Sequence, residues 1–132
     1  MRDLVRAAMI KSANDSCVAI AEGVAGSVPA FAAMMNQKAQ QLGATDSHFV
    51  NPHGLHDPNH YTTARDLAII ARAALEIPFF NQIVKERQTT IHGNWKIGDN
   101  RVLINRNRLL FRWPEADGVK TGYTRQAGRC LV

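Results

Sequence analysis

The chain has 132 residues, enough for one domain whose core buries most of its apolar surface. Apolar residues make up 45% and charged residues 20%, which excludes a disordered chain, and no apolar run approaches the roughly 20 residues that span a bilayer. The whole net charge of +5 lies in residues 96–132, where eight Lys/Arg accompany three Asp/Glu, so this segment is expected to attract an anionic ligand. Its arginines are scattered and follow no nucleic-acid-binding pattern, so no nucleic acid is predicted as a partner.

Residues 1 to about 85 show the 3.6-residue spacing of apolar side chains that is typical of helices. Asp3 is the expected cap of the first helix. Ser27 is a strong helix start because a proline follows two positions later, and Thr63 begins a near-capping box. The expected helices cover residues 3–10, 17–25, 27–42, 64–75 and 78–84.

Residues 44–62 are expected to form a loop, because they show little periodicity. Three histidines, His53, His56 and His60, stand beside Asp57 in this loop and look at first like metal ligands. Zinc sites need defined pair spacings on a rigid element, whereas this loop holds two prolines and a glycine. We therefore predict neither a metal site nor a cofactor.

After Glu86 the spacing changes to the two-residue period of strands. The strand-like segments are residues 87–91, 95–97, 102–104, 118–123 and 129–132. We expect the second and third to pair across a turn, residues 105–114 to form a loop, and the last two to form a hairpin around residues 125–128. The predicted fold class is α+β, with a helical part at about 1–85 and a part made of antiparallel strands at about 86–132.

The two cysteines do not make a disulfide framework. Cys17 and Cys130 each fall in an apolar pattern and are expected to be buried as small hydrophobic side chains. A disulfide between them is an alternative, which requires that the second helix and the last strand touch.

The segment Asp117–Thr124 places a cation, a hydroxyl and a glycine at consecutive positions, Lys120, Thr121 and Gly122. Neighbouring side chains of a strand point to opposite faces, so Lys120 and Thr121 do not share one face unless the strand twists or lines the edge of a cleft. Gly122 leaves room for another backbone or a ligand. A lysine and a threonine beside a bare backbone edge suit a ligand with a carboxylate next to an amide, and an ordinary edge strand is the alternative interpretation.

The tripeptide Ser12-Ala13-Asn14 lies 108 residues before Lys120. Serine and asparagine are natural cap and turn residues, so a helix N-terminus is the simpler interpretation of this tripeptide alone. In this order with Lys-Thr-Gly, it resembles two of the three elements of serine β-lactamases and penicillin-binding proteins. The third element, the nucleophile motif Ser-x-x-Lys, is absent, because the third residue after each serine is Asp15, Ala19, Ala30 or Val50.

Four segments together make the chain resemble the serine D-alanyl-D-alanine carboxypeptidases, which are the low-molecular-mass penicillin-binding proteins. The four, spread over essentially the whole chain, are Lys11–Asp15, Asn51–Leu55, Tyr61–Leu67 and Asp117–Thr124. The resemblance implies part of a β-lactamase-like transpeptidase fold, with the site in the cleft between a helical subdomain and an antiparallel sheet. It also implies removal of the terminal D-alanine from peptidoglycan stem peptides through an acyl-enzyme, without a metal.

The resemblance assigns catalytic roles to Ser12, Asn14 and Lys120, which are therefore predicted to meet in space. Ser12 would relay a proton, Asn14 would hold the amide carbonyl of the substrate, and Lys120 would keep Ser12 and the ligand in electrostatic register.

The same resemblance assigns substrate binding to the strand that carries Thr121, Gly122 and Tyr123. Thr121 would bind the terminal carboxylate, and the backbone N–H of Tyr123 would be one donor of the oxyanion hole. The implied ligands are stem peptides ending in D-Ala-D-Ala and, for the complete domain, β-lactams. The implied location is the periplasm or the outer face of the cytoplasmic membrane, although no signal peptide is predicted in these residues.

Because Ser-x-x-Lys is absent, residues 1–132 are expected to be the central part of such a domain and to be inactive alone. An apolar strand edge at Cys130–Val132 predicts self-association. Two other interpretations stay open. One is part of a class A β-lactamase, which the Asn51–Leu55 loop and the want of an assignable Glu-bearing loop disfavour. The other is a non-catalytic ligand-binding or interaction module.

Overall fold

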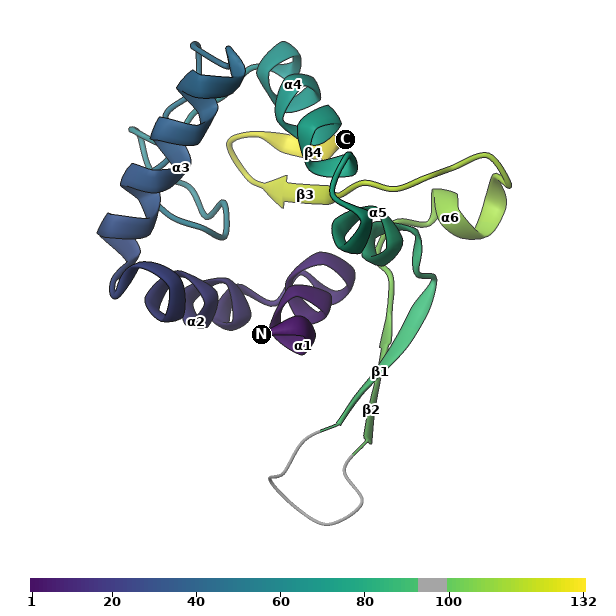
Figure 1. Ribbon diagram of the computed structural model, residues 1–132. Helices are drawn as coiled ribbons and strands as arrows, with labels where there is room; N and C mark the ends of the chain where they lie inside the picture. Colours follow the sequence, from purple (N-terminus) through teal and green to yellow (C-terminus); the bar gives the residue numbers. More distant parts are fainter. Residues whose placement is uncertain (93–99) are drawn as a thin grey trace.

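The computed structural model describes residues 1–92 and 100–132. Its helices form an arc that begins at the N-terminus and returns to it at α5 (Figure 1). In chain order they are α1 (Arg2–Arg6), the π-helix η1 (Ala7–Lys11), α2 (Asn14–Ala25), α3 (Val28–Leu42), α4 (Ala64–Leu75) and α5 (Pro78–Lys85). The short helix α6 (Leu109–Arg112) lies within the predicted loop 105–114, and its Leu110 is buried.

The helix ends follow from capping residues. Ser27 Oγ accepts a hydrogen bond from the Ala30 N–H at 3.3 Å, and Thr63 Oγ1 accepts one from the Asp66 N–H at 3.1 Å, so both predicted starts are confirmed. Asp3 is not a cap, because it lies inside the first turn of α1. Helix α2 begins at Asn14 rather than at residue 17, directly after the extended residue Ala13.

Two antiparallel hairpins complete the fold. Strand β1 (Gln88–His92) pairs with β2 (Asn100–Ile104), and β3 (Thr121–Thr124) pairs with β4 (Gly128–Leu131). The hairpin predicted over residues 118–132 is confirmed, and backbone bonds between Lys120 and Val132 extend it by one pair. The α+β class is confirmed as well.

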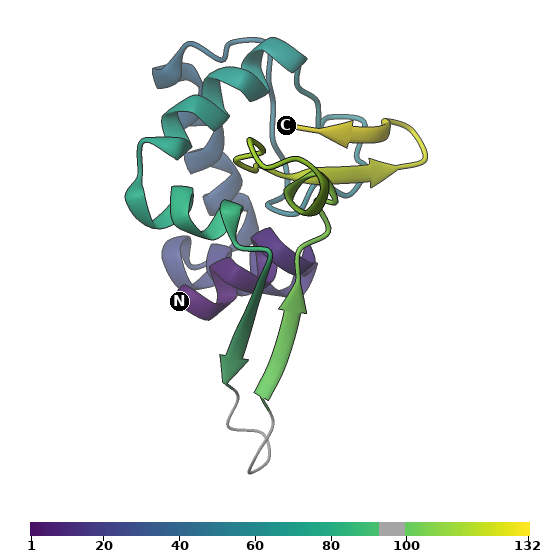
Figure 2. The same ribbon diagram turned by 90° about the vertical axis from the view of Figure 1, so that its right-hand side faces the viewer.

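The predicted partner of residues 102–104, residues 95–97, lies outside the described part of the chain. Residues 102–104 pair with residues 88–90, a partner that was not predicted from the sequence. This register places Leu103 in the core, where its side chain is 8% exposed, while the ribbon itself projects away from the helices (Figures 1 and 2). Burial of that side chain is a tertiary effect that local alternation does not reveal.

The main apolar cluster joins the helical part to the strand part. It contains Ala7 and Ile10 of η1, Ile83 of α5 and Leu103 of β2, all buried. The β3–β4 hairpin projects to one side of the helices (Figure 2), and β4 lines a cavity together with residues 60–68, where α4 begins. Helices and strands far apart in the sequence therefore meet around the end of η1.

Within residues 1–92 and 100–132 no single helix combines the length and apolarity needed to cross a membrane. Two sharply bent helix pairs, α2 with α3 and α4 with α5, meet those two criteria only jointly.

Candidate functional site

Ser12 sits at the turn between η1 and α2. The π-helix ends there with a wide closing bond from the Ala13 N–H to the Ala7 carbonyl at 3.2 Å, and Ser12 itself adopts a left-handed conformation with φ 60° and ψ 46°. A serine in this region is strained, and such strain together with a π-helical turn is common at functional sites. The strained turn presents the hydroxyl of Ser12 toward the β3 strand.

Lys120 reaches this hydroxyl from the other end of the chain. Its Nζ donates to Ser12 Oγ at 2.9 Å and to the Thr121 carbonyl at 2.7 Å. The predicted meeting of Ser12 and Lys120 is thereby confirmed across 108 residues. Burial lowers the pKa of the Lys120 amine, and the neighbouring Arg106 lowers it further, while Cys17 acts in the opposite direction. The two side chains form a hydrogen-bonded pair that is held partly out of water.

Asn14 is the first residue of α2, two positions after Ser12, and its side chain is exposed. The expected meeting of Asn14 with Ser12 and Lys120 remains a prediction.

One of the two backbone edges of β3 is directed away from β4. Lys120 bonds to Val132 through both its N–H and its carbonyl, and these bonds alternate along an antiparallel ladder. The N–H groups of Thr121 and Tyr123 therefore point to the free edge of β3, the edge on which the Thr121 carbonyl meets Lys120. The Tyr123 residue is 70% exposed, so this edge is accessible.

The glycine that the packing requires is Gly118 rather than Gly122. A Cβ on Gly122 would meet only Cys130 at 3.7 Å, an ordinary contact, so the described residues do not crowd it. Gly118 has φ 133°, and a Cβ there would lie 3.0 Å from Val84 Cγ2. Sequence reasoning missed this position because the crowding comes from α5.

Arg106 and Cys17 were also missed as neighbours of the site. Both act electrostatically on Lys120, and burial raises the pKa of the Cys17 thiol. Cys17 follows Ser12 by just over one helical turn, a spacing that offered a signal. The position of Arg106 gave no such signal in the sequence, because Arg106 lies in the segment after β2, far from Ser12 along the chain.

The cysteines correct one prediction. Both thiols are free, Cys17 is half-buried, and Cys130 is exposed on β4. The expectation that both are buried was therefore wrong for Cys130, which is exposed on a two-stranded hairpin, and is met only in part by Cys17. Cys17 and Cys130 do not form a disulfide, so that alternative is wrong.

The histidines of the loop bind its own backbone. The Nδ1 atoms of His53 and His60 accept hydrogen bonds from the N–H groups of Leu55 and Val50, and His48 Nδ1 contacts the Asn59 carbonyl at 2.6 Å. Among the residues that the structure describes, no group of three or more His, Cys, Asp or Glu is arranged to hold a metal ion.

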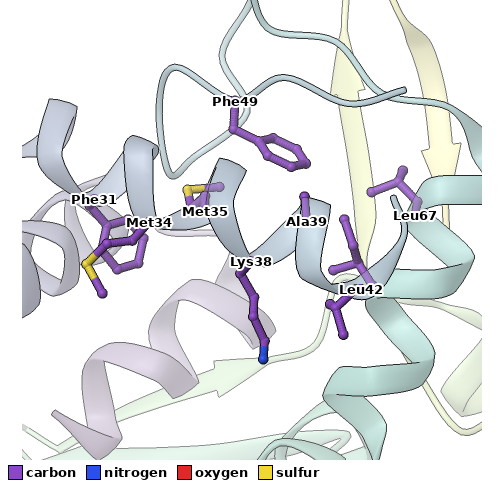
Figure 3. A pocket seen from close by; sticks show the side chains of 9 residues that line it. Phe31, Met34, Met35, Lys38, Ala39, Leu42, Phe49 and Leu67 are labelled. Atoms are coloured by element: carbon purple, nitrogen blue, oxygen red, sulfur yellow. The ribbon is translucent and has the colours of Figure 1, made fainter. Parts of the chain in front are cut away.

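Two cavities lie apart from the Ser12–Lys120 pair. The first, of about 430 Å³, is apolar and lies between α3, α4 and the loop residue Phe49, with the amine of Lys38 directed away from Phe49 (Figure 3). The second, of about 660 Å³, lies between residues 60–68 and residues 127–132 and holds Arg129. Neither is lined by Ser12 or Lys120, so the site is built on the turn and the strand edge.

Comparisons with known proteins match the whole chain to one family. Residues 1–132 match the peptidase S11 family, described as D-alanyl-D-alanine carboxypeptidase. The chain is 43% identical to the D-alanyl-D-alanine carboxypeptidase DacA of Haemophilus influenzae over 98% of this chain and 32% of that protein. It is 37% identical to DacF of Bacillus subtilis over 100% of this chain and 33% of that protein.

Solved structures are similar as well. The D-alanyl-D-alanine carboxypeptidase of Mycobacterium tuberculosis superposes with a TM-score of 0.88 at 35% identity, over 97% of this chain and 48% of that one. Penicillin binding protein 5 of Haemophilus influenzae gives 0.84 at 40% identity, over 98% and 36%. The chain spans about a third of the length of the curated relatives it matches.

Proposed function

Because this chain belongs to the peptidase S11 family of D-alanyl-D-alanine carboxypeptidases, we propose that it supplies the proton relay and the substrate-binding strand for removal of the terminal D-alanine from peptidoglycan stem peptides. One observation carries the proposal: the 2.9 Å hydrogen bond from Lys120 Nζ to Ser12 Oγ. The family assignment also sets aside the alternative of a β-lactamase, since the relatives described above are named carboxypeptidases.

The proposed proton relay depends on which atom donates in the hydrogen bond between Lys120 and Ser12. Lys120 donates to the Ser12 oxygen, which leaves the Ser12 hydroxyl hydrogen free to point at the leaving nitrogen of the substrate. When the scissile C–N bond breaks, Ser12 gives its proton to that nitrogen and receives one from Lys120. A lowered pKa of Lys120 suits this exchange, because the amine then gives up a proton more readily.

The strand edge provides the binding half. A carboxylate carries a permanent charge and is matched by the cation of Lys120 beside the Thr121 hydroxyl. The amide carbonyl becomes charged only in the tetrahedral state, so the fixed N–H of Tyr123 acts there as an oxyanion donor. Gly122 lies between Thr121 and Tyr123 without a side chain, and the exposed Asn14 holds the amide carbonyl of the substrate.

Titration of the chain with a peptide ending in D-Ala-D-Ala, followed by amide NMR, tests this binding half. We expect shifts confined to Thr121, Gly122, Tyr123 and the Ser12 turn, and their loss when the peptide carboxylate is amidated. Thr121→Val is the matched variant, since it keeps the shape and removes the hydroxyl. Equal binding of the amidated peptide would contradict the proposal.

The nucleophile is not among these residues, since no serine is followed by lysine at the third position. Ser12 is engaged with Lys120 as the relay, so we expect no covalent adduct when the chain is incubated with penicillin and weighed by intact-mass spectrometry. A stoichiometric adduct that disappears in Ser12→Ala would show that Ser12 is the nucleophile.

The partners and location of the whole protein follow from the same proposal. Its ligands are stem peptides and β-lactams, and it acts at the outer side of the cytoplasmic membrane or in the periplasm.

In isolation the chain associates through the edge of β4, where Leu131 is 53% exposed. Leu131→Lys lowers the apparent mass at high concentration in sedimentation, whereas an unchanged mass would point to another surface.

A further inference from the structure

The segment Asn105–Asn107, between β2 and α6, holds two asparagines whose side chains are buried although nothing in their local sequence demands it. Asn105 is 7% exposed and Asn107 is 2% exposed. Asn105 donates to the Glu86 carbonyl at 2.9 Å and accepts from the Asn107 N–H at 2.9 Å. Buried amides of this kind are retained when every bond is made, because an unpaired one costs more than an apolar side chain.

This segment is bonded to the element that ends at Ser12. The Arg106 N–H donates to the carbonyl of Ile10 at 3.2 Å, and Ile10 is fully buried two residues before Ser12. The Asn105 N–H donates to the Arg87 carbonyl at 2.9 Å, which fixes the same segment to the start of β1.

It is bonded to the strand that carries Lys120 as well. Asn107 Nδ2 donates to the Gly118 carbonyl at 2.8 Å, two residues before Lys120, and its Oδ1 accepts from the Leu109 N–H at 3.1 Å. Gly118 also packs closely on Val84, since a Cβ on this glycine would lie 3.0 Å from Val84 Cγ2. The backbone at Gly118 is therefore confined by both contacts.

We propose that Asn107 is a positioning residue, which fixes the backbone before Lys120 relative to the turn that carries Ser12 and so sets the hydrogen bond between those two side chains. The catalytic meaning of that bond rests on the proposed function, whereas the positioning itself does not. A hydrogen bond at 2.9 Å has little slack, since a lengthening of about half an ångström removes it. Arg106, held in the same segment, adds a positive charge on the Lys120 side of the site.

The test reads the Lys120 amine directly. In the 132-residue chain with ¹³C-labelled lysine, the Lys120 Cε signal is identified by its loss in Lys120→Arg and is titrated with pH. Asn107→Ala frees the Gly118 carbonyl and lets Lys120 reach water, so its titration midpoint is expected to rise toward the ordinary lysine value of 10.5.

The matched control is Asn36→Ala. Asn36 also bridges the backbone with both ends of its amide, donating to the Phe49 carbonyl at 2.8 Å and accepting from the Phe49 N–H at 2.7 Å, but it does so between α3 and the loop. A similar loss of stability is expected without a change in the Lys120 midpoint. Equal midpoints in Asn107→Ala and wild type, or an equal rise in the control, would overturn the inference.

Asn107→Ser guards against a variant that does not fold. Its hydroxyl still caps the Leu109 N–H but is too short to reach Gly118, so the Lys120 midpoint is expected to rise as in the alanine variant. An unmoved midpoint in a folded Asn107→Ser also overturns the inference. If the peptide does not bind but the Asn107 variants still raise the titration midpoint of Lys120, the proposed function is wrong and the positioning role of Asn107 stands. If the peptide binds but the midpoint does not change, only the positioning role is wrong.

Discussion

Two substitutions at Ser12 remove the same hydroxyl and differ in backbone strain. Ser12→Gly accepts the left-handed conformation freely, whereas Ser12→Ala keeps the Cβ that makes it costly. After the larger flexibility of unfolded glycine is subtracted, we expect the glycine variant to be more stable by about 0.5–1 kcal/mol. Urea denaturation of the pair measures this difference. Alanine as the more stable variant would contradict the strained turn.

At the scale of residues, the sequence predicted a contact correctly where an ordered set of motifs was available. It did not predict contacts that depend only on packing between distant segments. Ser12 and Lys120 were paired correctly, although no local pattern joins them. Gly118 was passed over in favour of Gly122, because the atom that forbids a side chain belongs to Val84. The bonds of Asn107 were invisible for the same reason, since asparagine in a loop is ordinary.

At the scale of elements, Asp66 ties α4 to the loop that precedes it. Its Oδ2 accepts from the Asp46 N–H at 2.8 Å and from the Ser47 hydroxyl at 2.7 Å, and the residue is 2% exposed. Asp66→Ala leaves the Asp46 N–H unpaired and the Ser47 hydroxyl with Thr62 Oγ1, 2.7 Å away, as its remaining partner, so we expect a loss of about 2–3 kcal/mol in the free energy of unfolding. Asp57→Ala, which breaks one exposed bond, is the control and should cost about 0.5 kcal/mol. Equal losses would show that Asp66 does not anchor the loop.

The loop is expected to weaken in acid because of His60. Burial lowers the pKa of this imidazole, the charges of His53 and His48 act in the same direction, and Asp57 opposes them. With the folded pKa below the ordinary value of 6.5, the unfolded chain binds more protons between the two values, so stability is complete above about pH 6.5 and falls as the pH drops toward the folded value. Protonation would also remove the Nδ1 acceptor of the Val50 N–H.

Urea midpoints of wild type and His60→Asn at pH 7.5 and pH 5 measure this effect. The asparagine oxygen replaces the acceptor without titrating, so the variant should lose less stability on acidification. An identical pH dependence in both chains would exclude His60 as the cause.

The helix starts at Ser27 and Thr63 were predictable because capping is local, and each side chain acts within one turn of its own helix. The start of α2 at Asn14 was missed, because the apolar spacing begins only at residue 17. The partner of β2 was not predictable, since it depends on the burial of Leu103 among residues of η1 and α5.

At the scale of the whole molecule, Ile83 tests whether the two parts unfold together. Ile83 lies on α5 and is fully buried in the cluster with residues of η1 and β2. Ile83→Ala is therefore expected to lower the free energy of unfolding by about 2–5 kcal/mol. Far-ultraviolet circular dichroism and tryptophan fluorescence should shift to the same lower urea midpoint. Ile77→Ala, at a position that is 56% exposed, is the control. A tryptophan transition that moves alone would show that the parts unfold separately.

The separation of 108 positions between Ser12 and Lys120 has a consequence for the order of events during synthesis. A growing chain exposes η1, α2, α3, α4 and α5 before Lys120 has been added, and closing so long a loop is entropically slow compared with forming each helix. The hydroxyl of Ser12 is therefore synthesised long before the amine that binds it. The hydrogen bond between Ser12 and Lys120 is expected to form after the contacts among these five helices.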